Sequence, residues 1–300
     1  MRILVISQYF YPENFRINDL CIGLKNSGHS VVVLTAKPNY PKGKFFPGYS
    51  FFKKSKEEYK GIKVYRSPII PRGNATGFGL FLNYISFVIF GFFKLFFIKE
   101  KFDKIFVYAP SPITVGYLGI VASFIFKAKP FLWVHDLWPE SVKDAGGIKN
   151  KFLLFMVDLM TKSIYYFYDN ILVQSPSFKY YLLDQGVSED KIIFYPYYAE
   201  NFYRVVKENS EIKSKFGTGL KIIFAGNTGV SESLGGVIVL SYSPGTFETP
   251  TQAQPGESVG TIIFADESLN ASASIADVIG SGSVAQIKST VRGSTPLGGG

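Results

Sequence analysis

Short apolar runs alternate with helix-like stretches along residues 1–229, and this alternation constrains the fold more than any other feature. The apolar runs are at 2–7, 31–35, 62–66, 104–109, 130–135, 170–175 and 191–196, and the helix-like stretches at 13–27, 78–99, 112–126, 150–168 and 177–186. Continuous apolar strands are typical of a parallel sheet that is buried on both faces. The sequence therefore predicts an α/β class fold with a doubly wound parallel sheet.

Composition divides the chain near Gly229. Residues 1–229 carry 30 Lys and Arg against 17 Asp and Glu, whereas residues 230–300 carry 2 against 6. Of the 50 aromatic residues, 47 lie before position 230. We expect a Rossmann-like domain at 1–200, a linker with the first strand of a second domain at 201–229, and an unassigned Gly/Ser/Thr-rich tail at 230–300.

The tail contains two short β-like runs, at 236–242 and 260–266, in text rich in Gly, Ser, Thr and Pro. Three explanations stay open for it. It is a small β-rich module, a disordered linker, or the product of a truncated or fused reading frame.

Several functional classes are excluded by composition or by missing motifs. The single cysteine, Cys21, excludes an internal disulfide, and the two histidines, His29 and His135, exclude a histidine-rich metal site. No G-x-G-x-x-G follows the first strand and no P-loop is present. The lysines are scattered without a recognition motif, which argues against nucleic-acid binding. The start "MRILVIS" predicts a buried strand and not a signal peptide.

The stretch "HDLWPES" at 135–141 follows an apolar strand and predicts functional side chains at its carboxyl end. In doubly wound folds, ligands bind beyond the carboxyl ends of the strands. Pro139 favours an extended Trp138 and a helix that begins at Pro139, with Glu140 in the first turn. Asp136 and Glu140 then line a cleft, or they only cap this helix and interact with its dipole.

Two other loops at the same edge carry candidate binding residues. Glu13 and Arg16 follow the first strand, where the planar fork of Arg16 suits a diphosphate; the alternative is a surface Glu–Arg pair. Asn39 and Tyr40 lie in the proline-fixed loop 37–43 after the second strand, where we expect them to be displayed.

The segment 77–98 resembles a membrane helix, because it carries no charged residue except Lys94. As a helix it reaches roughly 33 Å, enough to cross a bilayer. A crossing would place the strands before and after it on opposite sides of the membrane. Lysines flank it on both sides, so we expect it to lie in the face of an anionic membrane. A fully buried core helix is the alternative.

Residues 1–229 resemble the amino-terminal domain of a family 4 glycosyltransferase of the GT-B fold, nearest to the WbuB-like enzymes of bacterial surface-polysaccharide synthesis. The stretches that carry this resemblance are "ISQYFYPENFRINDL", "SGHSVVVLTAKPNYPKGK", "YAPSPITVG", "HDLWPES", "VQSPSF" and "IIFAGNTG", in order over about three quarters of the chain.

The resemblance implies transfer of a sugar, with retention, from a nucleotide donor that is expected to be a UDP-sugar. The acceptor would be a polyprenyl-diphosphate-linked saccharide at the cytoplasmic face of the bacterial inner membrane. His135 and Asp136 would lie beside the reacting sugar as catalytic residues, in a site that needs neither a metal nor a cofactor.

The resemblance also distributes the binding roles. Glu13, Arg16, Asn39, Tyr40, Trp138 and Glu140 would bind the acceptor, with Trp138 stacked on a sugar face, and Gly226 and Asn227 would lie on the donor side.

The tail departs from the family pattern. The family continues after "FAGNTG" with a donor domain that holds two glutamates eight positions apart; here Glu232, Glu248 and Glu257 have no such partner. We therefore expect this chain alone to be inactive. Two classes stay open: a glycosyltransferase by descent that lacks a recognisable donor domain, or a non-catalytic membrane-docking or acceptor-binding subunit with a separate donor-binding partner chain.

Overall fold

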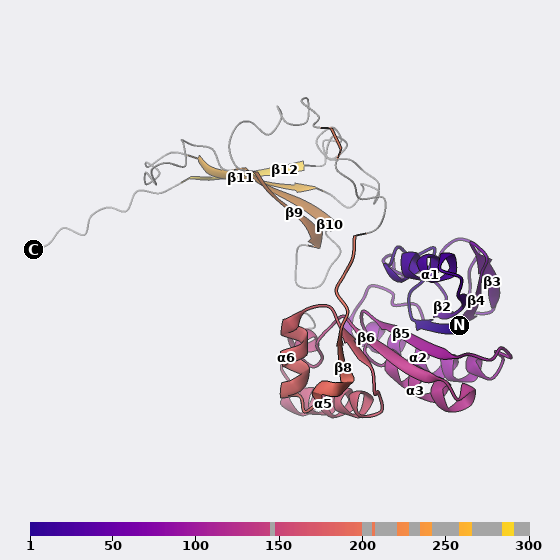
Figure 1. Cartoon of the computed structure of the whole chain (residues 1–300). Helices are drawn as coiled ribbons and strands as arrows, with labels where there is room; N and C mark the ends of the chain where they lie inside the picture. Colours follow the sequence, from indigo (N-terminus) through magenta and orange to yellow (C-terminus); the bar gives the residue numbers. More distant parts are fainter. Residues whose placement is uncertain are drawn as a thin grey trace, which may run out of the picture. The chain divides into compact units, whose positions relative to one another are not determined.

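The computed structural model describes residues 1–144, 148–199 and 206–207, and four further strands at 221–227, 235–241, 258–265 and 284–290 (Figure 1). The chain divides into two units, Met1–Phe202 and Tyr203–Gly300, and each is described here by itself.

The first unit is built on an eight-stranded sheet in the order β3-β4-β2-β1-β5-β6-β7-β8. Its strands are β1 (Arg2–Ser7), β2 (Ser30–Ala36), β3 (Lys56–Tyr59), β4 (Ile62–Ser67), β5 (Lys104–Ala109), β6 (Lys129–Val134), β7 (Ile171–Val173) and β8 (Ile192–Phe194). All neighbours are parallel except β3, which pairs antiparallel with β4. The doubly wound α/β fold is confirmed. The sequence missed β3 because this edge strand, "KEEY", has no apolar run.

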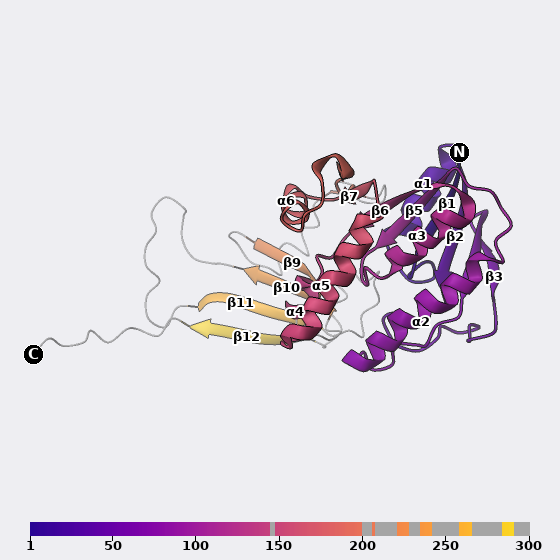
Figure 2. The ribbon, with the colours of Figure 1, turned by 90° about the horizontal axis from the view of Figure 1, so that it is seen from below.

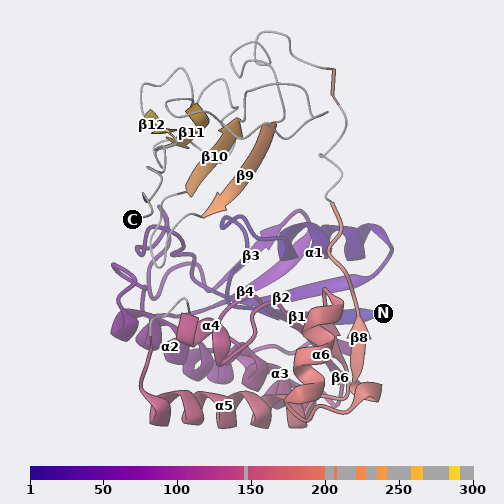
Figure 3. The ribbon, with the colours of Figure 1, turned by 90° about the vertical axis from the view of Figure 1, so that its left-hand side faces the viewer.

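Helices cover both faces of this sheet (Figures 2 and 3). They are α1 (Ile17–Asn26), α2 (Gly77–Leu95), α3 (Val115–Phe126), α4 (Glu140–Asp144), α5 (Lys151–Tyr166) and α6 (Pro176–Asp184). Buried residues of α1 belong to one apolar cluster, and those of α2, α3, α5 and α6 belong to the other. The sheet is therefore wound on both sides, with α1 alone on one face.

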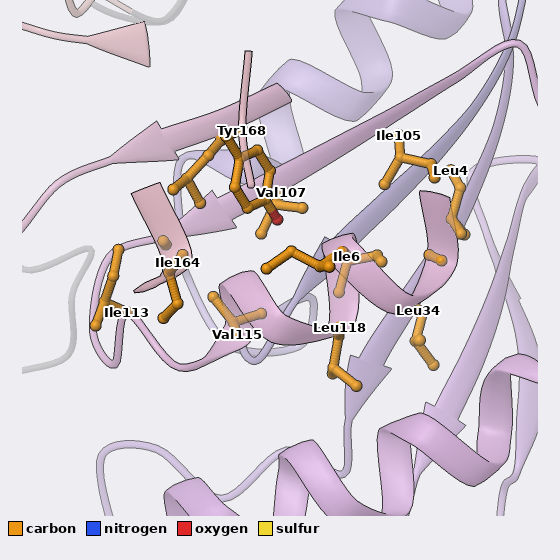
Figure 4. Packing of buried hydrophobic residues seen from close by; sticks show 14 of the residues in the cluster. Leu4, Ile6, Leu34, Ile105, Val107, Ile113, Val115, Leu118, Ile164 and Tyr168 are labelled. Carbon is orange, nitrogen blue, oxygen red and sulfur yellow. The ribbon is translucent and has the colours of Figure 1, made fainter. Parts of the chain in front are cut away.

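The strand β1 shows why both faces are buried. Leu4 and Ile6 pack in the cluster beneath α2 and α3, whereas Ile3 and Val5 pack against α1. Successive side chains of a strand point to opposite faces, so a continuous apolar run serves two cores at once. Figure 4 shows the larger core, where Tyr168 packs beside Val107 and its hydroxyl donates to the Gly116 carbonyl at 2.7 Å.

The connections place a switch point between β1 and β5. From β1 the chain passes through α1 to β2 on one side, and from β4 it returns through α2 to β5 on the other side of β1. Ligands of open α/β sheets bind outside the carboxyl ends of the strands at such a point. The loops that follow β1 and β5 therefore mark the centre of the candidate site.

The α2 helix rests on the sheet by one face only. Its buried residues are Asn83, Ser86, Phe87, Gly91 and Leu95. The opposite face exposes a row of large apolar residues at helical spacing: Phe78, Phe81, Ile85, Ile89, Phe92, Phe93 and Phe96. The alternative of a fully buried core helix is wrong. By length and composition α2 passes the test for a membrane-crossing helix, although its buried residues pack within the first unit.

The second unit is described only by its strands β9 (Lys221–Asn227), β10 (Gly235–Ser241), β11 (Ser258–Ala265) and β12 (Val284–Thr290). They form an antiparallel sheet in the order β12-β11-β10-β9. The strands β10 and β11 coincide with the two β-like runs expected in the tail. Most of the remaining tail and most of the expected linker lie outside the described residues.

Candidate functional site

Loops from both halves of the sheet are joined by side-chain contacts at its carboxyl edge. They follow β1 (8–16), β2 (37–43), β4 (68–76), β5 (110–114), β6 (135–139) and β8 (195–199). Hydrogen bonds link the first three loops to one another, and a separate contact links the loops after β6 and β8. Groups that are far apart in the sequence therefore meet at one edge of the sheet.

Glu13 holds the loops after β1 and β2 together. Its carboxylate is 2% exposed and accepts the backbone N–H groups of Asn39 and Tyr40, each at 2.8 Å, and that of Phe10 at 3.3 Å. Burial raises its pKa to about 7, although the three N–H donors oppose this shift. Because this carboxylate is buried and accepts these three N–H groups, it does not form a surface Glu–Arg pair, and that predicted alternative is wrong. Backbone N–H groups therefore already occupy the acceptor oxygens of the Glu13 carboxylate.

Asn39 is buried, at 1% exposure, and not displayed as we expected. Its Oδ1 accepts from the Arg72 backbone N–H at 3.2 Å and from Asn83 Nδ2 at 3.3 Å. Asn83 belongs to α2 and accepts from Gln8 Nε2 at 2.8 Å. Gln8 Oε1 is buried without a partner among the described residues. A polar chain thus joins α2 to the switch point and ends in an unused acceptor.

Arg72 lies beside this chain, in the loop between β4 and α2. It forms no ion pair with any carboxylate of the described residues, and its Nε is buried without a partner there. Its guanidinium carbon lies 5.0 Å from the centroid of the Tyr40 ring. A half-buried cation that lacks an anion makes this place suitable for an anionic ligand.

Tyr84 of α2 connects Arg72 with Asp136. Burial is the largest cause of the shift in Tyr84 and raises its pKa. The positive charge of Arg72 lowers this pKa, and the negative charge of Asp136 raises it. Burial also raises the pKa of Asp136, and a hydrogen bond from Ser111 opposes that shift. The guanidinium of Arg72 and the carboxylate of Asp136 are therefore both close to this tyrosine.

Asp136 is partly buried in the loop after β6. Within the described part of the chain, no backbone N–H of α4 donates to its carboxylate; the first turn bonds to the carbonyls of Leu137 and Pro139 instead. The capping alternative for Asp136 therefore lacks the hydrogen bond that defines a cap.

His135 is packed among aromatic rings, at 9% exposure. The centroid of its ring lies 4.3 Å from that of Trp133 and 4.5 Å from that of Tyr108. Its Nδ1 is hydrogen-bonded to the Tyr197 hydroxyl. Burial, and to a smaller extent Arg16, lowers its pKa to about 3, so the imidazole is neutral. The buried Nε2 has no partner in the described residues.

Arg16 is held by the segment after β8. Its guanidinium donates to the Tyr198 carbonyl and lies 4.6 Å from the centroid of the Tyr197 ring. Tyr197 thus contacts both Arg16 and His135, two residues that the sequence placed in separate loops. Sequence reasoning missed Tyr197, although it directly follows the predicted run at 191–196 and so lies at the same carboxyl edge.

The positions of Trp138 and Glu140 differ from those expected of acceptor-binding residues. Trp138 is 8% exposed within the larger apolar cluster, so neither face of its ring is open to a sugar. Glu140 Oε2 accepts from the Tyr181 hydroxyl, which also donates to the Trp138 carbonyl at 3.1 Å. Both residues fasten the loop after β6 to α6.

The remaining predicted residues, Gly226 and Asn227, lie at the end of β9 in the second unit and pair with Gly236 and Gly235 of β10. Their expected role in donor binding stays a prediction. Among the residues that the structure describes, no three His, Cys, Asp or Glu side chains gather to hold a metal ion.

The sequence also missed Arg72, Tyr84 and Ser111. A usable signal was present for Arg72, because "PRGN" follows a predicted strand at the same carboxyl edge as the other loops. Ser111 carries the same signal, because it follows the predicted strand at 104–109. Tyr84 carries none, since its position depends on how α2 crosses the sheet.

A wide apolar surface lies on the outer side of the helices α2, α3 and α5. Besides the row on α2, it includes Phe124 of α3 and a second row on α5: Phe152, Phe155, Met156 and Leu159. The helices α2 and α5 flank α3 on one face of the sheet (Figure 3). Exposed apolar surfaces of this extent mark interaction sites.

Comparison with known proteins supports part of the resemblance. No protein-family model matches the chain. It is 25% identical over 252 residues to "Putative colanic acid biosynthesis glycosyl transferase WcaI" of Escherichia coli (strain K12). This alignment covers 79% of the chain and 61% of the relative. The chain thus spans about three fifths of the relative's length.

Among solved structures, sucrose-phosphate synthase from Thermosynechococcus elongatus matches with a TM-score of 0.50 and 17% identity, over 73% of this chain and 53% of that one. This likeness shows the fold alone and agrees with the GT-B fold class. The sequence similarity supports the resemblance to a glycosyltransferase. The assignments to family 4 and to the WbuB-like group stay predictions.

Proposed function

We propose that the chain binds the acceptor in a glycosyltransferase reaction of bacterial surface-polysaccharide synthesis. A sugar passes from a nucleotide donor, a UDP-sugar, to a lipid-linked saccharide, with retention at the anomeric carbon. The observation that carries this proposal is a set of buried polar atoms in loops at the carboxyl edge that have no hydrogen-bond partner among the described residues: Arg72 Nε, Gln8 Oε1 and His135 Nε2. The similarity to WcaI supplies the reaction class.

Arg72 is the residue that we assign to the acceptor diphosphate, in place of Arg16. The guanidinium of Arg16 already stacks on Tyr197 and donates to the Tyr198 carbonyl, whereas Arg72 has no anionic partner in the described residues. Arg72 also lies five residues before α2, whose outer face is apolar. A diphosphate on Arg72 would leave the attached lipid close to that face.

Asp136 and His135 act next to the reacting sugar in this proposal. The raised pKa of Asp136 shows that its carboxylate is poorly solvated, as is common for groups that exchange protons or stabilise charge. His135 is neutral, so it serves as a hydrogen-bond donor or acceptor and not as a fixed positive charge. Tyr197 fixes the orientation of its ring.

Membrane docking completes the proposal and places the chain at the cytoplasmic face of the inner membrane. The apolar surface of α2, α3 and α5 would rest on the lipid, and lysines near α2 would face anionic headgroups. Neither a metal nor a cofactor enters the proposed reaction.

One observation favours the second candidate, an acceptor-binding subunit without its own donor site. The four described strands of the second unit are antiparallel, whereas nucleotide-binding sheets of doubly wound domains are parallel. Titration of the purified chain with UDP separates the candidates. Saturable binding would favour a donor site within the chain, and its absence would favour a partner chain.

The test of the acceptor site joins residues 1–229 to the carboxyl-terminal domain of a related enzyme and assays transfer from UDP-sugars to a polyprenyl-diphosphate-linked saccharide. Arg72→Gln should weaken acceptor binding by a factor of about 10 to 100, because a charge-assisted pair is lost. Asp136→Asn should lower kcat by about 100-fold or more and leave Tm unchanged.

Arg2→Gln is the matched control for Arg72, since Arg2 is an exposed arginine at the opposite end of β1. It should leave transfer unchanged. Full activity of both the Arg72 and the Asp136 variants would refute the proposed site, and the absence of transfer by the unsubstituted fusion with every acceptor tried would refute the reaction.

A further inference from the structure

A cavity of about 550 Å³ opens between the carboxyl-terminal half of α2 and the segment that leads into β3. Its walls include the rings of Phe90, Phe93 and Phe97 and the side chains of Lys56, Lys94 and Lys99. Phe90 is fixed from the other side by Phe51, at 5.2 Å between ring centroids. Neither Arg72 nor Asp136 lines this cavity, and the proposed reaction does not use it.

The three lysines of this cavity bring positive charge to its wall. None of them forms an ion pair with a carboxylate of the described residues. The neighbouring carboxylates are occupied elsewhere: Glu57 pairs with Arg66, and Glu100 pairs with Lys63 at 2.6 Å. The pKa of Lys94 is lowered by burial and by the charge of Lys56, which agrees with a site that lacks an anion.

The aromatic residues that line the cavity are also left partly exposed. Phe93 is 58% exposed and Phe97 is 65% exposed, and both continue the apolar row of α2. Covering such rings with apolar atoms removes them from water and so stabilises the bound state. A ligand for this cavity must therefore combine an anionic group with an apolar chain.

We propose that the cavity binds one anionic glycerophospholipid of the membrane, with its phosphate between Lys56, Lys94 and Lys99 and an acyl chain on Phe90, Phe93 and Phe97. This inference deepens the membrane docking proposed above and rests on it. It names a lipid class and the residues that select it. Charge complementarity distinguishes this occupant from a zwitterionic lipid or an apolar peptide.

The experiment measures binding of the full chain to vesicles of phosphatidylcholine alone and of phosphatidylcholine mixed with phosphatidylglycerol. The unsubstituted chain should bind the mixed vesicles more tightly. Replacing Lys56, Lys94 and Lys99 together with Gln should weaken binding to mixed vesicles by about 100-fold, since each lysine near an anionic surface contributes about 1 kcal/mol.

The matched control replaces three exposed lysines outside the cavity, Lys25, Lys101 and Lys129, with Gln, so the net charge falls equally. This variant should lose much less affinity than the cavity variant. Thermal melts of both variants check that they fold. An equal loss of vesicle affinity in the two variants would show that general surface charge causes the effect, and it would overturn the proposal.

Soluble ligands separate the lipid from its phosphate. Monomeric dihexanoyl-phosphatidylglycerol should bind the chain, whereas glycerol 1-phosphate and dihexanoyl-phosphatidylcholine should bind at least about tenfold more weakly. A photoactivatable phosphatidylglycerol should cross-link to peptides that span 90–99. Binding of glycerol 1-phosphate as tight as that of the lipid, or cross-links elsewhere, would refute the site. No assay here uses a sugar donor, so these results stand apart from the test of transfer.

Discussion

At the scale of single residues, the carboxyl edge of the sheet holds ionisable groups that have been removed from water. Desolvation is the largest cause of the pKa shift in Glu13, His135 and Asp136. It raises the pKa of the two acids and lowers that of the histidine, because burial always disfavours the charged form. All three groups therefore move toward neutrality, which lowers the fixed charge at this edge of the sheet.

Glu13 should make stability depend on pH. Its pKa rises from 4.5 to about 7 on folding, so the contribution of the protonated form is complete below pH 4.5 and is lost as the pH rises through 7. Glu13→Gln cannot ionise. The unfolding free energy of the wild type minus that of the variant should fall by about 3 kcal/mol between pH 4.5 and pH 8.

Urea unfolding of both proteins at several pH values measures this difference. A constant offset between the two curves is expected in addition, because one N–H donor loses its acceptor in the variant. A difference that does not change with pH would show that Glu13 keeps its ordinary pKa.

His135 should contribute no titration near neutral pH. Its folded pKa of about 3 keeps the ring neutral above pH 5, so the protonation state of this residue is constant there. Nuclear magnetic resonance of the His135 ring should show one neutral form from pH 5 to 8. In Tyr197→Phe, the pKa of His135 should stay below its ordinary value of 6.5, since burial is the main cause. A midpoint near 6.5 in the wild type would contradict this.

At the scale of elements, α2 and α3 show how a helix can serve two surroundings. The α2 helix buries the polar residues Asn83 and Ser86 on the same face as Phe87, and exposes large apolar residues on its opposite face, unlike an ordinary amphipathic helix. This arrangement requires α2 and α3 to pack closely against their neighbours on the buried side. An added Cβ at Gly91 would meet Leu118 of α3 at 2.7 Å, and one at Gly119 would meet Tyr168 and Val107.

Gly119→Ala should therefore lower the unfolding free energy by about 1–3 kcal/mol through overpacking. It would also disturb the hydrogen bond from Tyr168 to Gly116. Gly23→Ala in α1 is the control, because nothing lies within 4 Å of its added Cβ. That change should raise stability by up to about 1 kcal/mol. Equal effects in urea unfolding would contradict the close packing of α3.

The exposed row on α2 should govern membrane affinity without affecting the core. Replacing Phe81, Ile85 and Ile89 with Ser should weaken vesicle binding by about tenfold or more and leave Tm nearly unchanged. Phe87→Ser should do the opposite, because this side chain is fully buried: Tm should fall steeply. Vesicle flotation and thermal melts report the two effects. Unchanged flotation of the triple variant would exclude α2 as the docking surface.

At the scale of the whole molecule, the two units differ in composition as well as in architecture. The first unit contains two aromatic-rich apolar clusters around a parallel sheet. The second has four described antiparallel strands, and residues 230–300 contribute only three aromatic residues. A segment with so little large apolar surface gains little from hydrophobic burial.

Limited proteolysis should therefore leave a protected fragment that corresponds to the first unit, Met1–Phe202, and should cut residues 230–300 first. Mass spectrometry of the early fragments identifies the cleavage points. A digestion that opens the parallel sheet while residues 230–300 remain intact would contradict this order.

The sequence by itself determined the class of the fold, because a continuous apolar strand can be satisfied only where both faces of a sheet are covered. It also identified the edge that carries Glu13, Arg16, His135 and Asp136, since parallel strands end together. It could not assign individual roles. Glu13, Asn39 and Trp138 belong to motifs that look functional, yet the structure buries them, and burial depends on contacts with distant segments.

Only the tertiary structure decided which side chains lack partners. Arg72 is separated from Asp136 by more than sixty positions, and their effects meet at Tyr84 because α2 crosses to the far side of β1. The sequence did not determine which face of α2 is exposed, and the reason is similar. A segment that is apolar on nearly all sides carries no periodicity, so the neighbours that cover one face determine which residues face outward.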